Sequence, residues 1–73
     1  MILQNSKVGK TYKVIELKLD EMAGHRLEAL GLTTGTFIQV MNNKKDGSII
    51  FKVRGTRLAI GKDIASQIVV EEA

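Results

Sequence analysis

The chain has 73 residues, of which 44% are hydrophobic and 26% are charged, and it carries a formal net charge of +3 with no cysteine. Without cysteine it cannot form a disulfide, a thiolate zinc site, an iron–sulfur cluster or a cysteine nucleophile. A chain this short needs nearly all of its apolar side chains for its core. We therefore expect one domain over residues 1–73 that binds or regulates rather than catalyses.

The positive charge is concentrated in one segment. Residues 44–62 contain six basic side chains against a single acidic one, whereas residues 63–73 contain only acidic charges. Such a basic segment can bind an acidic protein surface, nucleic acid or phospholipid headgroups, or it can be the solvated face of a β-hairpin. No run reaches the ~18 apolar residues that span a bilayer, and residues 1–10 do not resemble a signal peptide, so we expect a cytoplasmic protein.

The first predicted strand covers residues 11–19, a run rich in β-branched and apolar residues. Tyr12 and Val14 share one parity, whereas Ile15 and Leu17 share the other. A change of parity within a strand indicates a β-bulge or a sharp bend.

A helix is predicted next, over residues 20–30. Asp20 can cap its N-terminus, and Gly31 can end it in a left-handed conformation, with Leu32 folding back onto the last turn. The expected apolar stripe, spaced i, i+4 and i+7, consists of Ala23, Leu27 and Leu30. We expect this helix to plug the barrel that the strands form.

Four further strands are predicted over residues 36–41, 49–54, 57–60 and 67–71. Between the first two, residues 42–47 have the Asn, Asp and Gly content of a hairpin loop. Apolar residues alternate with Lys52 and Arg54, which predicts one buried and one exposed face of that strand. The pattern predicts a mainly β fold: a small SH3-like five-stranded barrel with one inserted α-helix.

The sequence has no recognisable catalytic set. A single histidine excludes a histidine pair for zinc and gives no support for a Ser–His–Asp triad. Residues 31–36, although they contain two glycines, lack the lysine and the following helix of a phosphate-binding loop. We therefore predict no enzyme activity and no cofactor.

One helical face could hold a metal ion. Glu21, His25 and Glu28 are spaced i, i+4 and i+7, so all three project from the same side of the predicted helix. Carboxylates and an imidazole in this arrangement could share a divalent cation. The alternative is a solvent-exposed face with weak side-chain pairs.

Residues 26–36 (RLEALGLTTGT), followed by apolar Ile38 and Val40, resemble the ferrous iron transport protein A (FeoA) family. Residues 55–61 (GTRLAIG) and the closing strand at 67–71 resemble it as well, so the resemblance covers essentially the whole chain. It implies an SH3-like barrel with an inserted helix that serves as a small cytoplasmic accessory protein of ferrous iron transport. The implied partner is the membrane transporter FeoB, whose cytoplasmic part carries a GTP-binding domain.

The partner surface is expected on the helix 20–30 with its turn at 31–35, or on the basic hairpin 44–57. Arg26 has two interpretations: its guanidinium can reach strand-end carbonyls or a carboxylate of the barrel, or it can anchor a partner. The candidate partner-binding residues are Arg26, Leu32, Thr33, Lys44, Lys45, Lys52, Arg54 and Arg57.

Three alternatives stand beside this hypothesis. Similar domains occur at the C-terminus of metal-dependent repressors, which implies a metal-sensing module. Small barrels with a basic hairpin, here 44–57, also bind nucleic acid, but they need aromatic side chains amid the charge, and neither Tyr12, Phe37 nor Phe51 is predicted to form a stacking pair there. Self-association through the edge of strand 67–71 would involve Ile68, Val69 and Val70.

Overall fold

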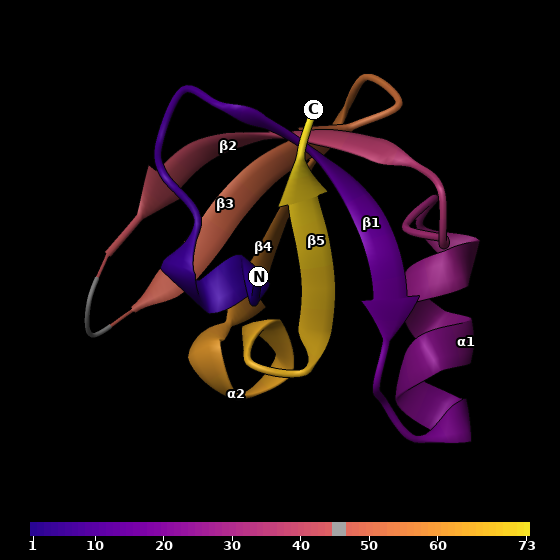
Figure 1. Cartoon of the computed structure of the whole chain (residues 1–73). Coiled ribbons are helices and arrows are strands. Elements are labelled where there is room, and N and C mark those ends of the chain that lie inside the picture. The colour runs from indigo at the N-terminus through magenta and orange to yellow at the C-terminus, as the bar shows by residue number, and fades with distance from the viewer. Residues whose placement is uncertain (45–46) are drawn as a thin grey trace.

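The computed structural model describes residues 1–44 and 47–73 and contains one antiparallel sheet that curves around the core (Figure 1). Its strands, in the order β4-β3-β2-β1-β5, are β1 (Thr11–Leu17), β2 (Phe37–Asn43), β3 (Ser48–Val53), β4 (Thr56–Gly61) and β5 (Ile68–Glu72). The helices are η1 (Leu3–Asn5, a 3-10 turn), α1 (Glu21–Ala29) and α2 (Lys62–Ala65). This confirms the mainly β, SH3-like fold with five strands and an inserted helix, and η1 and α2 are additions to it.

The predicted hairpin loop at 42–47 is only partly described. Asn42 and Asn43 are the last residues of β2 rather than loop residues, which corrects the prediction there. Residues 45–46 lie outside the described part of the chain.

Strand β1 bends at a β-bulge. Val14 pairs with Val70 of β5, and the next pair is Glu16 with Val69, so the register shifts by one residue at Ile15. Val14 is buried, whereas Ile15 is exposed. The structure thus confirms the irregularity that the change of parity predicts, and beyond it β1 continues to pair with β5 as far as Leu17.

The core is one cluster of thirteen buried hydrophobic side chains from η1, α1, α2, the residue after Gly31 and every strand except β4. The predicted alternation in β3 is confirmed, since Ile49, Phe51 and Val53 are fully buried and Lys52 is exposed. Each fully buried aliphatic or aromatic side chain contributes about 1.5–3 kcal/mol. Strand β4 contributes only half-buried side chains to the edge of this cluster.

Helix α1 lies beside the sheet (Figure 1) and inserts a single side chain, Leu27, into the core. Ala23 is half-buried and Leu30 is 48% exposed, so the prediction that Leu30 belongs to a buried stripe is wrong. The plugging role that was expected of α1 is shared with η1 and α2, which bury Leu3 and Ala65. In the described part of the chain, no helix combines the length and the apolar composition needed to cross a membrane.

The N-terminus of α1 is capped as predicted. The Ala23 N–H donates a hydrogen bond of 2.8 Å to Oδ1 of Asp20, and Glu21 adds a negative charge that the helix dipole favours. Further along, Gly24 occupies the helix interior, where a Cβ would meet nothing within 4 Å. Glycine there weakens the helix without any steric need for it.

The C-terminus of α1 is a Schellman motif. Gly31 has a φ of 99°, and its N–H donates to the carbonyl of Glu28 at 2.9 Å. The N–H of Leu32 donates to the carbonyl of Leu27, also at 2.9 Å. Leu27 and Leu32 both belong to the buried core, so the turn at Gly31 places two apolar anchors on the same side of the chain.

Substitution by alanine is expected to have opposite effects on stability at Gly24 and at Gly31. Gly24→Ala is expected to raise the free energy of unfolding by about 0.5–1 kcal/mol, because alanine restricts the unfolded chain and favours a helix. Gly31→Ala is expected to lower it by roughly 1–2 kcal/mol, because a Cβ is strained in the left-handed region. Urea unfolding followed by circular dichroism measures both, and changes of the same sign would contradict the assigned helix end.

An ion pair joins the loop before β1 to the end of β5. Lys10 Nζ lies 2.5 Å from Glu72 Oε1, and both side chains are about half exposed. The hydrogen bond from Lys10 and its charge lower the pKa of the Glu72 carboxyl, and the same contacts with Glu72 raise the pKa of Lys10. Solvent screens this surface pair, so its contribution to stability is small.

The pair predicts a specific pH dependence. The stabilisation from Glu72 is fully present above the ordinary carboxyl pKa and is lost as the pH falls through the lowered value. The stabilisation from Lys10 is fully present below the ordinary lysine pKa and is lost as the pH rises through the raised pKa of Lys10. In the variant Lys10→Met, the pKa of Glu72 measured by NMR titration should return toward its ordinary value. In the control variant Lys18→Met, the pKa of Glu72 should stay as it is in the natural protein. Equal effects of the two substitutions would contradict the pairing.

Candidate partner-binding site

An apolar groove runs between α1 on one side and β4 with α2 on the other. Its volume is about 320 Å³, and its lining residues are Ala23, Arg26, Leu27, Leu30, Ala59, Ile60, Gly61 and Ile64. Ala59 and Gly61 are small, and β4 sends no fully buried side chain toward the core, so space stays open beside the helix. A groove of this size accepts one or two apolar side chains of a partner rather than a large ligand.

Leu30 is the exposed apolar wall of this groove. It is 48% exposed because it is the last residue before the turn at Gly31, where the chain leaves the helix. Covering the remaining half of a leucine side chain gains about 1 kcal/mol. Leu27 lies buried in the same groove, so a partner side chain that enters would contact the edge of the core.

Arg26 also lines this groove, and it is exposed. Within the described residues its guanidinium forms no hydrogen bond and no ion pair. The interpretation in which it reaches strand-end carbonyls or a carboxylate of the barrel is therefore wrong for this part of the chain. The other interpretation, an anchor for a partner's carboxylate, is consistent with its position.

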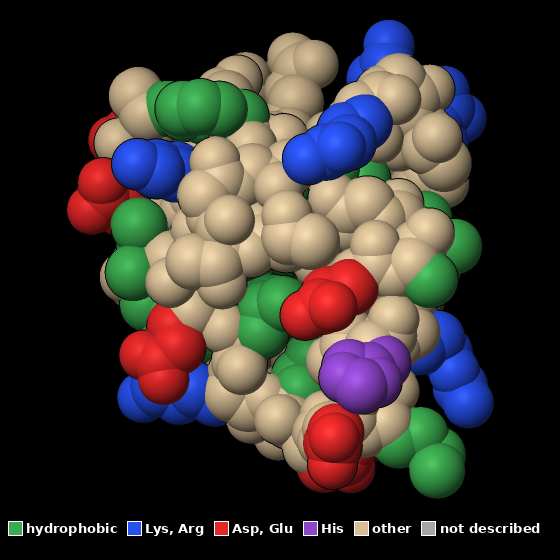
Figure 2. Space-filling model, turned by 90° about the vertical axis from the view of Figure 1, so that its right-hand side faces the viewer, with side chains coloured by type: hydrophobic (Ala, Val, Ile, Leu, Met, Phe, Trp, Pro, Cys, Tyr) green, Lys and Arg blue, Asp and Glu red, His purple; other side chains and the backbone are tan. Residues whose placement is uncertain are grey.

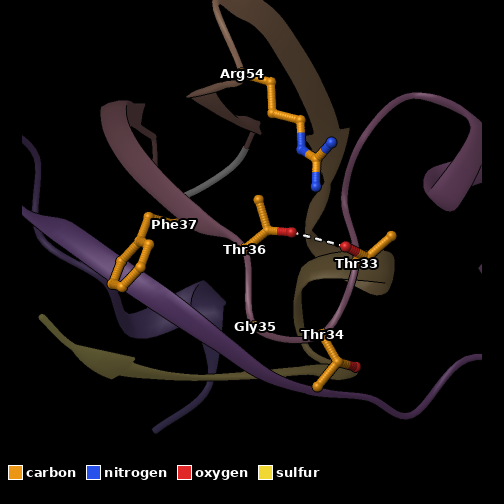
Figure 3. A pocket seen from close by; sticks show the side chains of 6 residues that line it. All are labelled: Thr33, Thr34, Gly35, Thr36, Phe37 and Arg54. Atoms are coloured by element: carbon orange, nitrogen blue, oxygen red, sulfur yellow. Dashed lines mark hydrogen bonds between the residues drawn. The ribbon is translucent and has the colours of Figure 1, made fainter.

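A second hollow lies beyond the end of α1 (Figure 3). It has a volume of about 510 Å³ and is lined by Thr33, Thr34, Gly35, Thr36, Phe37 and Arg54. The N–H of Thr36 donates to the carbonyl of Thr33 at 3.1 Å, and Gly35 has a φ of 92°, which makes residues 33–36 a type II turn. The hydroxyls of Thr33 and Thr36 lie 2.7 Å apart, and the Arg54 guanidinium points toward them (Figure 3).

The candidate metal-binding residues all lie exposed on α1. Acidic side chains flank the single histidine on this face of the molecule (Figure 2). Nevertheless, among the residues that the structure describes, no group of three or more histidine or carboxylate side chains is placed to hold a metal ion. Glu21, His25 and Glu28 therefore share a solvent-exposed face without forming such a cluster.

The remaining candidate residues are spread over the surface, with one exception. Leu32 is fully buried, so its side chain has no surface to offer a partner, and its place among the partner-binding residues is wrong. Thr33 and Arg54 meet in the second hollow. Lys44, Lys52 and Arg57 are exposed but line neither hollow, and Lys45 lies outside the described residues.

The outer edge of β5, a candidate surface for self-association in the sequence analysis, is partly paired with the N-terminal residues. Ile2 pairs with Val69, and Met1 and Val70 exchange two hydrogen bonds of 2.7 and 2.8 Å. Ile68 and Val70 are fully buried. Self-association through this edge, one of the alternatives above, would therefore have to displace the N-terminal residues that already pair with Val69 and Val70.

Sequence reasoning missed the β4–α2 wall of the groove and the exposure of Phe37. Phe37 is 57% exposed, although it is one of only two phenylalanines in the chain. The exposure of Phe37 could have been found from the alternation along the strand, because Phe37 lies on the face opposite the buried Ile38 and Val40. Parity alone could also have placed Ala59 on the exposed face of β4, but it could not have shown α1 lying beside it.

The five antiparallel strands with an inserted helix define the class of small SH3-like domains, and the described surface carries two open hollows. The family model of the FeoA domain matches residues 1–72. A protein of Methanocaldococcus jannaschii named "Putative Fe(2+) transport protein A" is 35% identical over 63 residues, which are 84% of this chain and 76% of that protein. The chain therefore belongs to the FeoA family, an accessory family of ferrous iron transport.

Solved structures agree with this assignment. A crystal structure described as an iron uptake regulatory protein (FeoA) superposes with a TM-score of 0.92 at 33% identity, covering all of this chain and 97% of the other. The FeoA protein of Chlorobium tepidum gives a TM-score of 0.88 at 24% identity, with 99% and 70% covered. The repressor ScaR, solved with bound Zn²⁺, has a TM-score of 0.88 at 23% identity, but the match covers 37% of it and shows likeness of fold alone.

The exposed acidic face of α1 gives a test of the metal hypothesis. Because the three candidate side chains do not converge, we expect titration with Zn²⁺, Mn²⁺ or Fe²⁺ to leave the amide resonances of residues 21–28 without a saturable shift. The variant His25→Ala should show the same absence of a saturable shift as the natural protein. A saturable shift that His25→Ala abolishes would establish a metal site here.

Proposed function

We propose that this protein is a cytoplasmic accessory protein that binds the GTP-binding region of the membrane transporter FeoB. The observation that carries the proposal is the apolar groove beside α1 on a member of an iron-transport accessory family. Such a surface is suited to protein binding, since most of its lining is apolar and Leu30 is open to solvent. The protein contributes binding rather than a chemical step.

The groove specifies the chemistry of the segment that enters it. Leu27 and Leu30 favour an apolar side chain, and the guanidinium of Arg26 at the same groove, which has no ion-pair partner among the described residues, favours an acidic neighbour. A partner segment with an apolar residue next to a carboxylate therefore fits both features. The apolar contact supplies most of the affinity, and the exposed charge mainly supplies orientation and a faster encounter.

Binding regulates the transporter only if it distinguishes two of its states. A ligand shifts a conformational equilibrium by no more than the difference between its affinities for the two forms. We infer that the accessory protein binds the GTP-loaded and GDP-loaded forms of the cytoplasmic region with different affinities. A change in GTP turnover is the direct consequence.

A pair of matched substitutions on α1 tests the groove. Leu30→Ser is expected to weaken binding to the purified cytoplasmic region of FeoB about tenfold or more, because it removes the exposed apolar wall. Met22→Ser removes an apolar side chain that is 74% exposed on the same helix but outside the groove, and it should leave binding unchanged. Calorimetric titration gives both affinities, and circular dichroism checks the fold.

Two results would contradict the proposal at different levels. If the natural protein neither binds the cytoplasmic region nor changes its GTP turnover, the proposed function is wrong. If it binds but both variants bind equally well, the function stands and the groove is not the contact surface.

A further inference from the structure

The second hollow contains an arginine in an unusual backbone conformation. Val53 pairs with Thr56, so the β3–β4 hairpin has a two-residue loop made of Arg54 and Gly55. Their φ angles are 50° and 80°, and two positive values identify a type I′ turn. Asn, Asp or Gly is favoured at the first loop position, whereas a long side chain there is strained. Arg54 is the only residue other than glycine with a positive φ in the described chain.

The strain at Arg54 is not offset by a polar contact with any described residue. Among the described residues its guanidinium forms neither an ion pair nor a hydrogen bond. Its stem instead lies against the end of α1, where its Cδ would be 3.5 Å from a Cβ built on Gly31. Strained residues that the fold does not need for its own contacts are concentrated at functional sites.

The described lining of the hollow offers hydrogen-bond donors and contains no acidic side chain. The Thr33 and Thr36 hydroxyls share one hydrogen bond, so one of the two O–H groups remains available to donate. None of the described residues that line the hollow carries a side-chain carboxylate. The guanidinium and the hydroxyls approach from different sides (Figure 3), which suits a tetrahedral anion better than a flat carboxylate.

An exposed aromatic ring lies across the hollow from Thr33 (Figure 3). Phe37 lines the same hollow and is 57% exposed (Figure 3). The side chain of Lys52 is exposed on the neighbouring strand, opposite Gln39, and adds positive charge to that region of the sheet surface. An exposed phenylalanine beside cationic donors stacks planar groups such as nucleobases.

We propose that this hollow binds a phosphate ester with an aromatic group, as in a mononucleotide. Arg54 and the threonine hydroxyls bind the phosphate, and Phe37 stacks against the ring. The site is separate from the groove that we assign to the transporter and does not depend on that assignment.

Titration of the ¹⁵N-labelled protein with AMP, inorganic phosphate, adenosine and acetate tests the site by NMR. We expect saturable shifts at residues 33–37 and at Arg54 with AMP and phosphate, with tighter binding of AMP because of stacking on Phe37. Raised salt should weaken both. No saturable shift at these residues, or adenosine or acetate binding as tightly as AMP, would overturn the proposal.

Arg54→Asn separates binding from folding. Asparagine tolerates the left-handed turn, so this variant should unfold at a higher urea concentration while binding AMP about tenfold more weakly or worse. Arg57→Asn removes a nearby exposed arginine outside the hollow and should leave affinity unchanged. Unaltered binding by Arg54→Asn would overturn the site.

Phe37→Leu tests whether the ring of Phe37 stacks against the aromatic group of the ligand. It should reduce the preference for AMP over inorganic phosphate about fivefold or more, because leucine cannot stack on the base. If the preference persists in this variant, the role of Phe37 is wrong.

Discussion

The left-handed turn at Gly31 is the constraint on which the functional surfaces depend. Its φ of 99° lets the chain reverse so that Leu27 before it and Leu32 after it both enter the core. The reversal leaves Leu30 outside, where it forms a wall of the groove. It also leads into the turn that carries the threonines, and the stem of Arg54 lies beside it, at ordinary contact distance from a Cβ built on Gly31.

The small size of the chain explains why both of its candidate sites are open to solvent. Thirteen buried side chains form the core, and three helical elements of different length close it. Little apolar material remains to enclose a deep pocket in a domain of this length. The groove and the hollow are therefore open, and each is lined by residues from elements that meet only in the folded protein, α1 with β4 and the 33–36 turn with the β3–β4 hairpin.

The local features were predictable because they depend on short stretches of sequence. The bulge at Ile15, the cap at Asp20, the stop at Gly31 and the alternation in β3 all follow from neighbouring residue types. The errors have another origin. A helical stripe cannot show that its last member, Leu30, projects beyond the sheet, because that depends on how α1 is placed against β4.

Both sites show the same limit of sequence reasoning. Arg54 was expected at the surface, but only the paired register of β3 and β4 shows that it occupies the first position of a two-residue turn. The open edge that Val69 and Val70 suggested is paired instead with residues nearly seventy positions away. Contacts of such separation leave no trace in local periodicity.

The turn at Arg54 shows how stability and function compete in this fold. A left-handed residue other than glycine costs roughly 1–2 kcal/mol, and a domain of this length has only about 4–11 kcal/mol of net stability. Asparagine would keep the turn and relieve much of that strain, so folding alone would favour it. The cost of an arginine at this position is offset if its guanidinium binds an anion. The place where the guanidinium can bind one is the hollow that Arg54 lines together with two hydroxyls and an exposed ring, where no carboxylate is among the described lining residues.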